Sequence, residues 1–92
     1  MLNYKVAYHL RMGAFFAEVL DFPEATAFGP TVAAAREGVL YALRYAAQRL
    51  LRRGELLPVP DPNRAAPDAY LVEVVSLLPS PDEGVWVQTV SA

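Results

Sequence analysis

The chain has 92 residues, a formal net charge of −2, an apolar fraction of 54% and no cysteine. A chain this short forms one domain near the lower size limit for a self-sufficient core. We therefore expect further burial in a homo-oligomer, a dimer or tetramer, or against another partner. The small net charge gives no argument for a nucleic-acid or membrane partner, and the missing cysteine excludes disulfides, a thiolate nucleophile and a sulfur-ligated metal.

The N-terminal residues 1–5 lack the basic region and apolar core of a signal peptide. Apolar runs also stay shorter than the roughly 18 to 20 residues that a membrane-spanning helix needs. We expect a cytoplasmic protein.

The first elements predicted along the chain are strands. Apolar and polar residues alternate from Asn3 to Leu10, and residues 14–20 are rich in aromatic and β-branched side chains. The short turn at residues 11–13 between them predicts a hairpin. After a second turn at residues 21–24, residues 25–28 favour a short third strand.

A long helix is predicted from about Val32 to Arg53. Thr31 is a suitable N-cap, Gly54 stands where a left-handed C-cap is needed, and the last turn is basic. Apolar residues recur every three or four positions, so one broad face should lie on the sheet. Gly38 inside this helix indicates a close approach between helix and sheet, although genome drift would also account for it.

The C-terminal third is predicted to be a connector followed by a second hairpin. Prolines at positions 58, 60, 62 and 67 make residues 57–68 extended, and the proline-rich part at 61–68 leads into a C-terminal hairpin within 69–92. Residues 69–78 form a strand with two apolar faces, which predicts burial on both sides, either centrally in the sheet or at an oligomer interface. A turn at 79–84 and a fifth strand at 85–90 follow.

Three motifs follow one another between residues 15 and 60. Residues 15–23, Phe-Phe-Ala-Glu-Val-Leu-Asp-Phe-Pro, match an aromatic strand followed by Asp-(Leu/Phe)-Pro-Gly-Cys. Gly29 and Thr31 match Gly-Asp-Thr at a helix start, and residues 54–60 match Gly-x-x-(Leu/Ile)-Pro-x-Pro. In this order and spacing the three motifs resemble the HicB antitoxin family. The match runs without gaps from about Tyr4 to Pro60, so residues 1–92 are interpreted as a single HicB-like domain with residues 1–60 as the family-matching core.

The chain departs from the family pattern in the turn and at the helix start. Glu24 stands where the family has glycine, Ala25 where it often has cysteine, Pro30 where it often has aspartate, and Ala34 where glutamate is common. These changes affect the turn conformation and any acidic contact at the helix start. The order of the elements is unaffected.

The resemblance implies a fold and a function. The fold is α+β, a partial RNase H-like ββ(β)αβ(β) domain with an antiparallel sheet and one long helix across a face. HicB-like proteins neutralise small, basic HicA-like toxins, which cleave RNA, by covering their active surface. This implies a binding protein, not an enzyme, with no catalytic residue, cofactor or metal. The strand-like C-terminal residues leave no room for a three-helix DNA-binding unit, so direct DNA binding is not expected.

The residues predicted to bind a partner are Asp21, Phe22, Glu24 and Phe28, which lie around the turn at a sheet edge. An apolar anchor beside carboxylates would suit a basic protein surface. An equally strong alternative is that Phe22 is a core residue beneath the turn.

The sequence leaves other functions open. His9, the only histidine, fits a surface strand residue better than a general base, and Glu18, Asp21, Glu37 and Glu73 are the carboxylates that a nuclease would have to bring together. The chain could also be an orphan HicB-like homo-oligomeric module without a toxin. Less favoured is an RNA-binding protein that uses the arginines and tyrosines of the helix.

Overall fold

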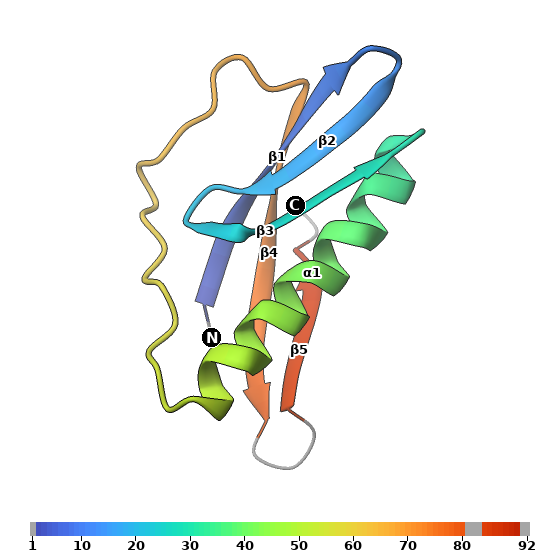
Figure 1. The fold of residues 1–92 in the computed structure, drawn as a ribbon. Helices are drawn as coiled ribbons and strands as arrows, with labels where there is room; N and C mark the ends of the chain where they lie inside the picture. Colours follow the sequence, from blue (N-terminus) through green and yellow to red (C-terminus); the bar gives the residue numbers. More distant parts are fainter. Residues whose placement is uncertain (1, 81–83, 91–92) are drawn as a thin grey trace.

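The computed structural model describes residues 2–80 and 84–90. One antiparallel five-stranded sheet curls around one long helix, in the strand order β3-β2-β1-β4-β5 (Figure 1). The elements are β1 (Leu2–Arg11), β2 (Ala14–Val19), β3 (Phe22–Gly29), α1 (Val32–Arg52), β4 (Leu71–Ser80) and β5 (Gly84–Thr89). The predicted α+β class, the element order and the single helix on one sheet face are confirmed.

The first hairpin forms as its sequence predicts. Met12 and Gly13, both with positive φ (52° and 81°), connect β1 to β2. Such a two-residue turn matches the right-handed twist of the paired strands. The register opposes His9 to Phe16 and Ala7 to Glu18, so these residues share one face of the sheet.

The turn predicted at residues 21–24 is shorter in the structure, because β3 already begins at Phe22. A register shift between Glu18 and Val19 accommodates the extra residues of β3. Pro23 is compatible with a strand here because β3 is an edge strand, where one backbone N–H need not join a ladder. The third strand therefore has eight residues instead of the four that were predicted.

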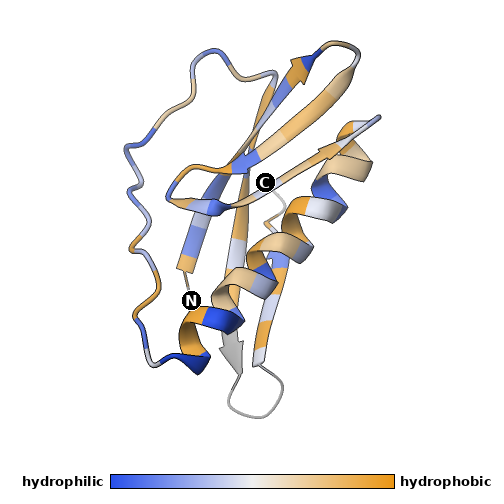
Figure 2. Cartoon of the chain, viewed as in Figure 1, coloured by the Kyte–Doolittle hydropathy of each residue, from blue (hydrophilic) through white to orange (hydrophobic). Residues whose placement is uncertain are grey.

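Helix α1 has the predicted caps. The Thr31 side chain accepts a hydrogen bond from the Ala34 N–H at 3.1 Å, and Gly54 has φ 72° just past the C-terminal end. The Glu55 N–H donates to the Leu50 carbonyl at 2.9 Å, which closes the last turn. The C-terminal turn combines hydrophilic arginines, Arg49 and Arg52, with the hydrophobic Leu50 and Leu51 between them (Figure 2).

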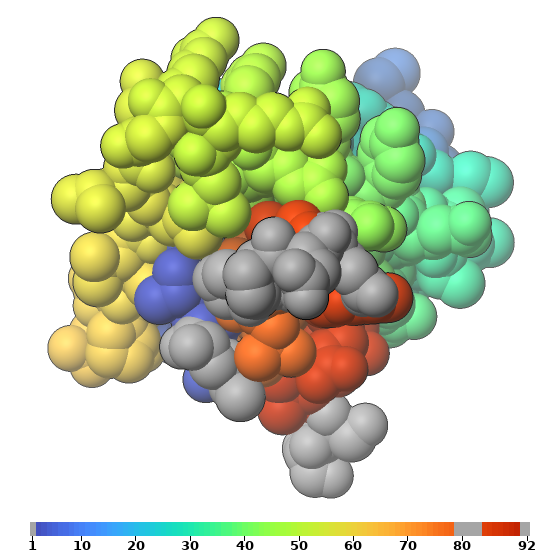
Figure 3. Space-filling model, turned by 90° about the horizontal axis from the view of Figure 1, so that it is seen from below, coloured from blue at the N-terminus to red at the C-terminus, as the bar shows by residue number. Residues whose placement is uncertain are grey.

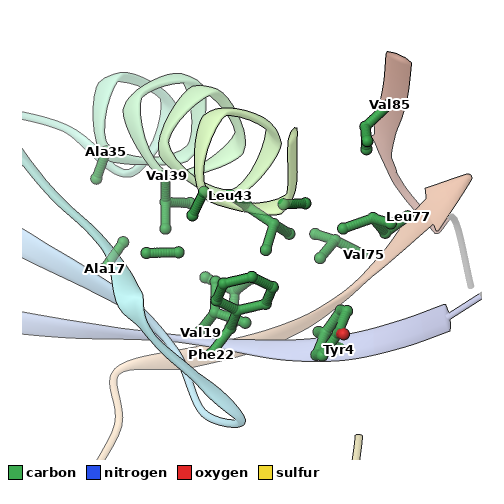
Figure 4. Close-up of a cluster of buried hydrophobic side chains, with 14 of the residues drawn as sticks. Tyr4, Ala17, Val19, Phe22, Ala35, Val39, Leu43, Val75, Leu77 and Val85 are labelled. Atoms are coloured by element: carbon green, nitrogen blue, oxygen red, sulfur yellow. The ribbon is translucent and has the colours of Figure 1, made fainter. Parts of the chain in front are cut away.

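The core lies between α1 and the concave face of the sheet (Figure 4). It contains Tyr4, Val6, Tyr8, Ala17, Val19, Phe22, Ala25, Ala35, Val39, Leu43, Ala46, Ala47, Val75, Leu77 and Val85. Gly38 faces β3, and a Cβ added to it would lie 2.9 Å from the Cβ of Ala27. The close approach predicted from Gly38 is therefore present, and it leaves no room for a side chain larger than hydrogen.

The strand predicted at 69–78 runs from Leu71 to Ser80 as β4, between β1 and β5. Its residues Val75 and Leu77 are buried beneath α1, but Val72 and Val74, on the opposite face, are 42% and 37% exposed. We call this opposite face of the sheet the free face. The central place predicted for this strand is thus confirmed, while burial of its second face at an oligomer interface stays a prediction, because α1 covers only one face. Of the turn predicted at 79–84, residues 81–83 lie outside the described residues.

Candidate partner-binding surface

Asp21 lies in the turn between β2 and β3, and its side chain is only 9% exposed. It accepts a hydrogen bond from the backbone N–H of Asp61 at 2.9 Å and forms an ion pair with Nε of Arg64 at 2.6 Å. Both partners belong to the connector. Lys5 holds the same segment, because its Nζ donates to the Pro62 and Arg64 carbonyls at 2.7 and 3.0 Å. Asp21 therefore fixes the connector to the sheet, a role that the sequence did not predict.

Phe22 is a core residue, which was one of the two alternatives for it. It is 1% exposed, and its ring meets the ring of Tyr4 edge to face, with centroids 5.7 Å apart. Burial, together with the negative charge of nearby Asp21, raises the pKa of Tyr4 to about 12. In this fold Phe22 supports the turn from beneath and offers no surface to a partner.

Glu24 is exposed on β3 and forms an ion pair with Arg49 of α1. Both side chains are about half exposed, so solvent screens the pair and its contribution to stability is small. A partner with a basic group can compete for this carboxylate at low energetic cost.

Phe28 is 69% exposed on the free face, on the edge strand β3. Its ring packs on that of Phe16 with centroids 4.9 Å apart, and the Arg11 guanidinium lies 5.4 Å from the Phe16 centroid. The His9 ring also stacks on the Phe16 ring, with centroids 6.1 Å apart, and His9 Nε2 forms a 2.7 Å hydrogen bond with the Glu18 carboxylate. These five residues make one group, which we call the Phe28 cluster.

The four predicted residues thus do not form one continuous surface. Asp21 is occupied by the connector, Phe22 is buried, Glu24 contacts α1, and Phe28 belongs to the free face. The other members of the Phe28 cluster could have been found from the sequence, because hairpin register places residues 9 and 16 side by side once the turn at 12–13 is fixed.

The outer flank of α1 carries a second group of exposed aromatic and polar side chains. Tyr41, Arg44, Tyr45 and Gln48 line a shallow hollow of about 110 Å³. The guanidinium of Arg44 lies 5.7 Å from the ring centroid of Trp86 on β5. This flank of α1 therefore adjoins β5.

Two of the helix arginines proposed for RNA binding are engaged within the chain. Arg49 pairs with Glu24, and Arg36 makes a two-pronged ion pair with Glu73 of β4 at 2.7 and 2.9 Å. The Arg36 hydrogen bonds are the main reason why the pKa of Glu73 is lowered. The Arg36 guanidinium lies 5.9 Å from the ring centroid of Tyr8. Burial, reinforced by the nearby Glu73 carboxylate, raises the pKa of the Tyr8 hydroxyl.

The carboxylates considered for a nuclease site point to separate partners. Glu18 faces His9, Asp21 the connector and Glu73 Arg36, while Glu37 is exposed on α1. Within residues 2–80 and 84–90 no three His, Asp or Glu side chains gather as they would around a metal ion. Over the same residues, no helix is both long and apolar enough to cross a membrane.

Comparisons with models of known protein families, with curated proteins and with solved structures gave no match.

Proposed function

We propose that this chain is a HicB-like antitoxin-type binding protein, which would occlude a small, basic HicA-like RNA-cleaving toxin. The family motifs at residues 15–23, 29–31 and 54–60 support the assignment. We propose in addition that the α+β domain has the partial RNase H-like fold of that family. The structural observation that carries the proposal is Phe28, a well-supported aromatic side chain that stands in solvent. Aromatic side chains of this kind dominate the binding energy of many protein interfaces.

The surroundings of Phe28 fit a partner of mixed polarity and positive charge. Two carboxylates lie near Phe28. Glu18 is on the neighbouring strand β2, on the free face, and Glu24 is on β3 itself. Each is held by one internal partner that is itself partly exposed, His9 and Arg49. In the proposed complex, basic groups of the toxin share these carboxylates while Phe28 enters an apolar pocket. Inhibition is then steric and electrostatic, with no covalent step.

An affinity capture of the tagged chain from its own host tests the proposal. We expect a small basic protein in near-stoichiometric amount, which cleaves RNA when it is separated from the chain. Phe28→Ala should weaken the complex by at least about tenfold, as a central aromatic contact does. Glu24→Lys should weaken it less, with the loss shrinking at high salt. Val59→Ala, at an exposed apolar connector position, is the matched control.

The second candidate is an orphan HicB-like homo-oligomeric module without a toxin. The exposed valines of the free face favour it, since apolar strand faces are usually covered. Capture of the chain alone as a defined oligomer, with no basic partner, would replace the antitoxin proposal by this one.

A further inference from the structure

The two edges of the sheet are built differently. At β3 the edge carries Pro23, a register shift beside it, and Glu24 paired with Arg49 of the adjacent helix. Proline, irregular register and charge are devices that prevent a further strand from adding to an edge. In contrast, β5 and the next residue, Gly-Val-Trp-Val-Gln-Thr-Val at 84–90, contain neither proline nor a charged side chain. Such an edge is suited to accept another strand.

The hydrogen-bonding groups of β5 that point away from the sheet can be assigned from its register. The Val90 N–H donates to the Val74 carbonyl at 2.9 Å, so even-numbered positions of β5 face β4. Because the direction alternates along an antiparallel strand, the N–H and C=O groups of Val85, Val87 and Thr89 point outward. They form a regular row of donors and acceptors along the open side.

We propose that β5 is a dimerisation edge, and that its occupant is the β5 strand of a second copy of this chain. An antiparallel pair with Val87 opposite Val87 of the partner would overlap residues 85–89 fully and form about six inter-strand hydrogen bonds. The row is self-complementary about this centre, as a two-fold interface requires. Residues 84–90 carry no charge, so the paired strands themselves do not repel each other. The proposal goes beyond the antitoxin function and does not depend on a toxin.

Side chains on both faces of the sheet extend the contact beyond the backbone. The C-terminal half of α1 lies directly beside β5 (Figure 3), and Gln48 approaches Gly84 so closely that a Cβ there would lie 2.7 Å from its Nε2. The hollow lined by Tyr41, Arg44, Tyr45 and Gln48 thus borders the edge. Arg44 and Gln48 are flexible and can repack against an incoming strand.

On the free face, Trp86, Val74 and Val90 are each exposed beside the same edge. A stable interface buries about 800 Å² per partner, more than one short strand supplies. Exposed apolar side chains beside the edge are available for part of the remaining area, and Trp86 is of a residue type enriched at interface centres. Dimerisation would also join the two free faces into one continuous surface.

Light scattering after size-exclusion chromatography tests the interface on the full chain. The wild type is expected at twice its 10.1 kDa mass, with a concentration-dependent shift to the monomer on dilution. Thr89→Pro removes an outward N–H and places the proline ring in the path of the partner strand, while the β4–β5 ladder keeps its bonds. It should raise the dimer dissociation constant by at least about tenfold. Thr89→Ala keeps the N–H and should remain dimeric.

Hydrogen exchange on the wild type gives a second, mutation-free test. In the dimer the outward amides of Val85, Val87 and Thr89 should exchange at least about tenfold more slowly than in a diluted monomeric sample. Trp86 is the only tryptophan, so its emission should shift to the blue as the dimer forms. A monomeric mass at millimolar concentration, a folded Thr89→Pro that dimerises like Thr89→Ala, or equal exchange of these amides at both concentrations would each overturn the proposal.

Discussion

Gly38→Ala tests the close packing of α1 on β3. Alanine is more favourable than glycine inside a helix by about 1 kcal/mol, so an exposed site would be stabilised. Here the new methyl carbon would lie 2.9 Å from the Cβ of Ala27, well inside the roughly 3.5 to 4.0 Å at which carbon atoms pack. Overpacking of this kind costs about 1–3 kcal/mol. We therefore expect a net loss of about 1 kcal/mol in the free energy of unfolding.

A double-mutant cycle with Ala27→Gly isolates the contact. With the opposing methyl removed, Gly38→Ala should become stabilising by up to about 1 kcal/mol, which gives a coupling energy of about 1–3 kcal/mol. Urea denaturation followed by circular dichroism measures all four proteins, and Glu37→Ala, at the exposed neighbouring position, controls for helix propensity. If Gly38→Ala stabilises the wild-type background and no coupling is found, the inferred helix–strand contact is absent.

Three further predictions concern stability. Phe22→Ala should cost about 3–5 kcal/mol as a core truncation, whereas Phe28→Ala should cost about 1 kcal/mol or less; equal losses in urea denaturation would contradict their placement. Glu73→Gln should cost about 1 kcal/mol at neutral pH. Because the pKa of Glu73 is lowered below its ordinary 4.5, its stabilisation is present above that value and lost at lower pH, so the variant and wild type should converge in acid. The pKa values of Tyr4 and Tyr8 are raised from 10.0, so the unfolded chain loses these protons first as the pH rises. The free energy of unfolding should therefore fall above pH 10 by about 1.4 kcal/mol per pH unit for each tyrosine. Tyr4→Phe should remove one of the two contributions and so halve the slope up to about pH 12.

The sequence predicted those parts of the fold that depend on local pattern. Alternation located the first strand and composition the second, and Thr31 and Gly54 marked the ends of α1, because these signals involve residues close in the chain. The start of β3 was predicted too late, since Pro23 looks like a strand breaker unless the strand is known to be an edge.

Long-range partners were not predictable by the same reasoning. Asp21 forms an ion pair with Arg64, which lies more than forty positions further along the chain. Arg64 belongs to the proline-rich connector, and no repeating sequence pattern indicates the path of that segment. Likewise, the pairing of Glu73 with Arg36 follows from how α1 crosses the sheet. The candidate site was therefore only partly defined by sequence: Phe28 and Glu24 are surface residues, while Asp21 and Phe22 maintain the turn.

The most direct test of the proposed function is an RNA-cleavage titration with the captured basic partner. We predict that cleavage falls to background when one equivalent of the chain is added, and that Phe28→Ala requires a large excess for the same effect. Cleavage that continues unchanged at saturating chain, or a captured partner that cleaves no RNA, would contradict the antitoxin assignment.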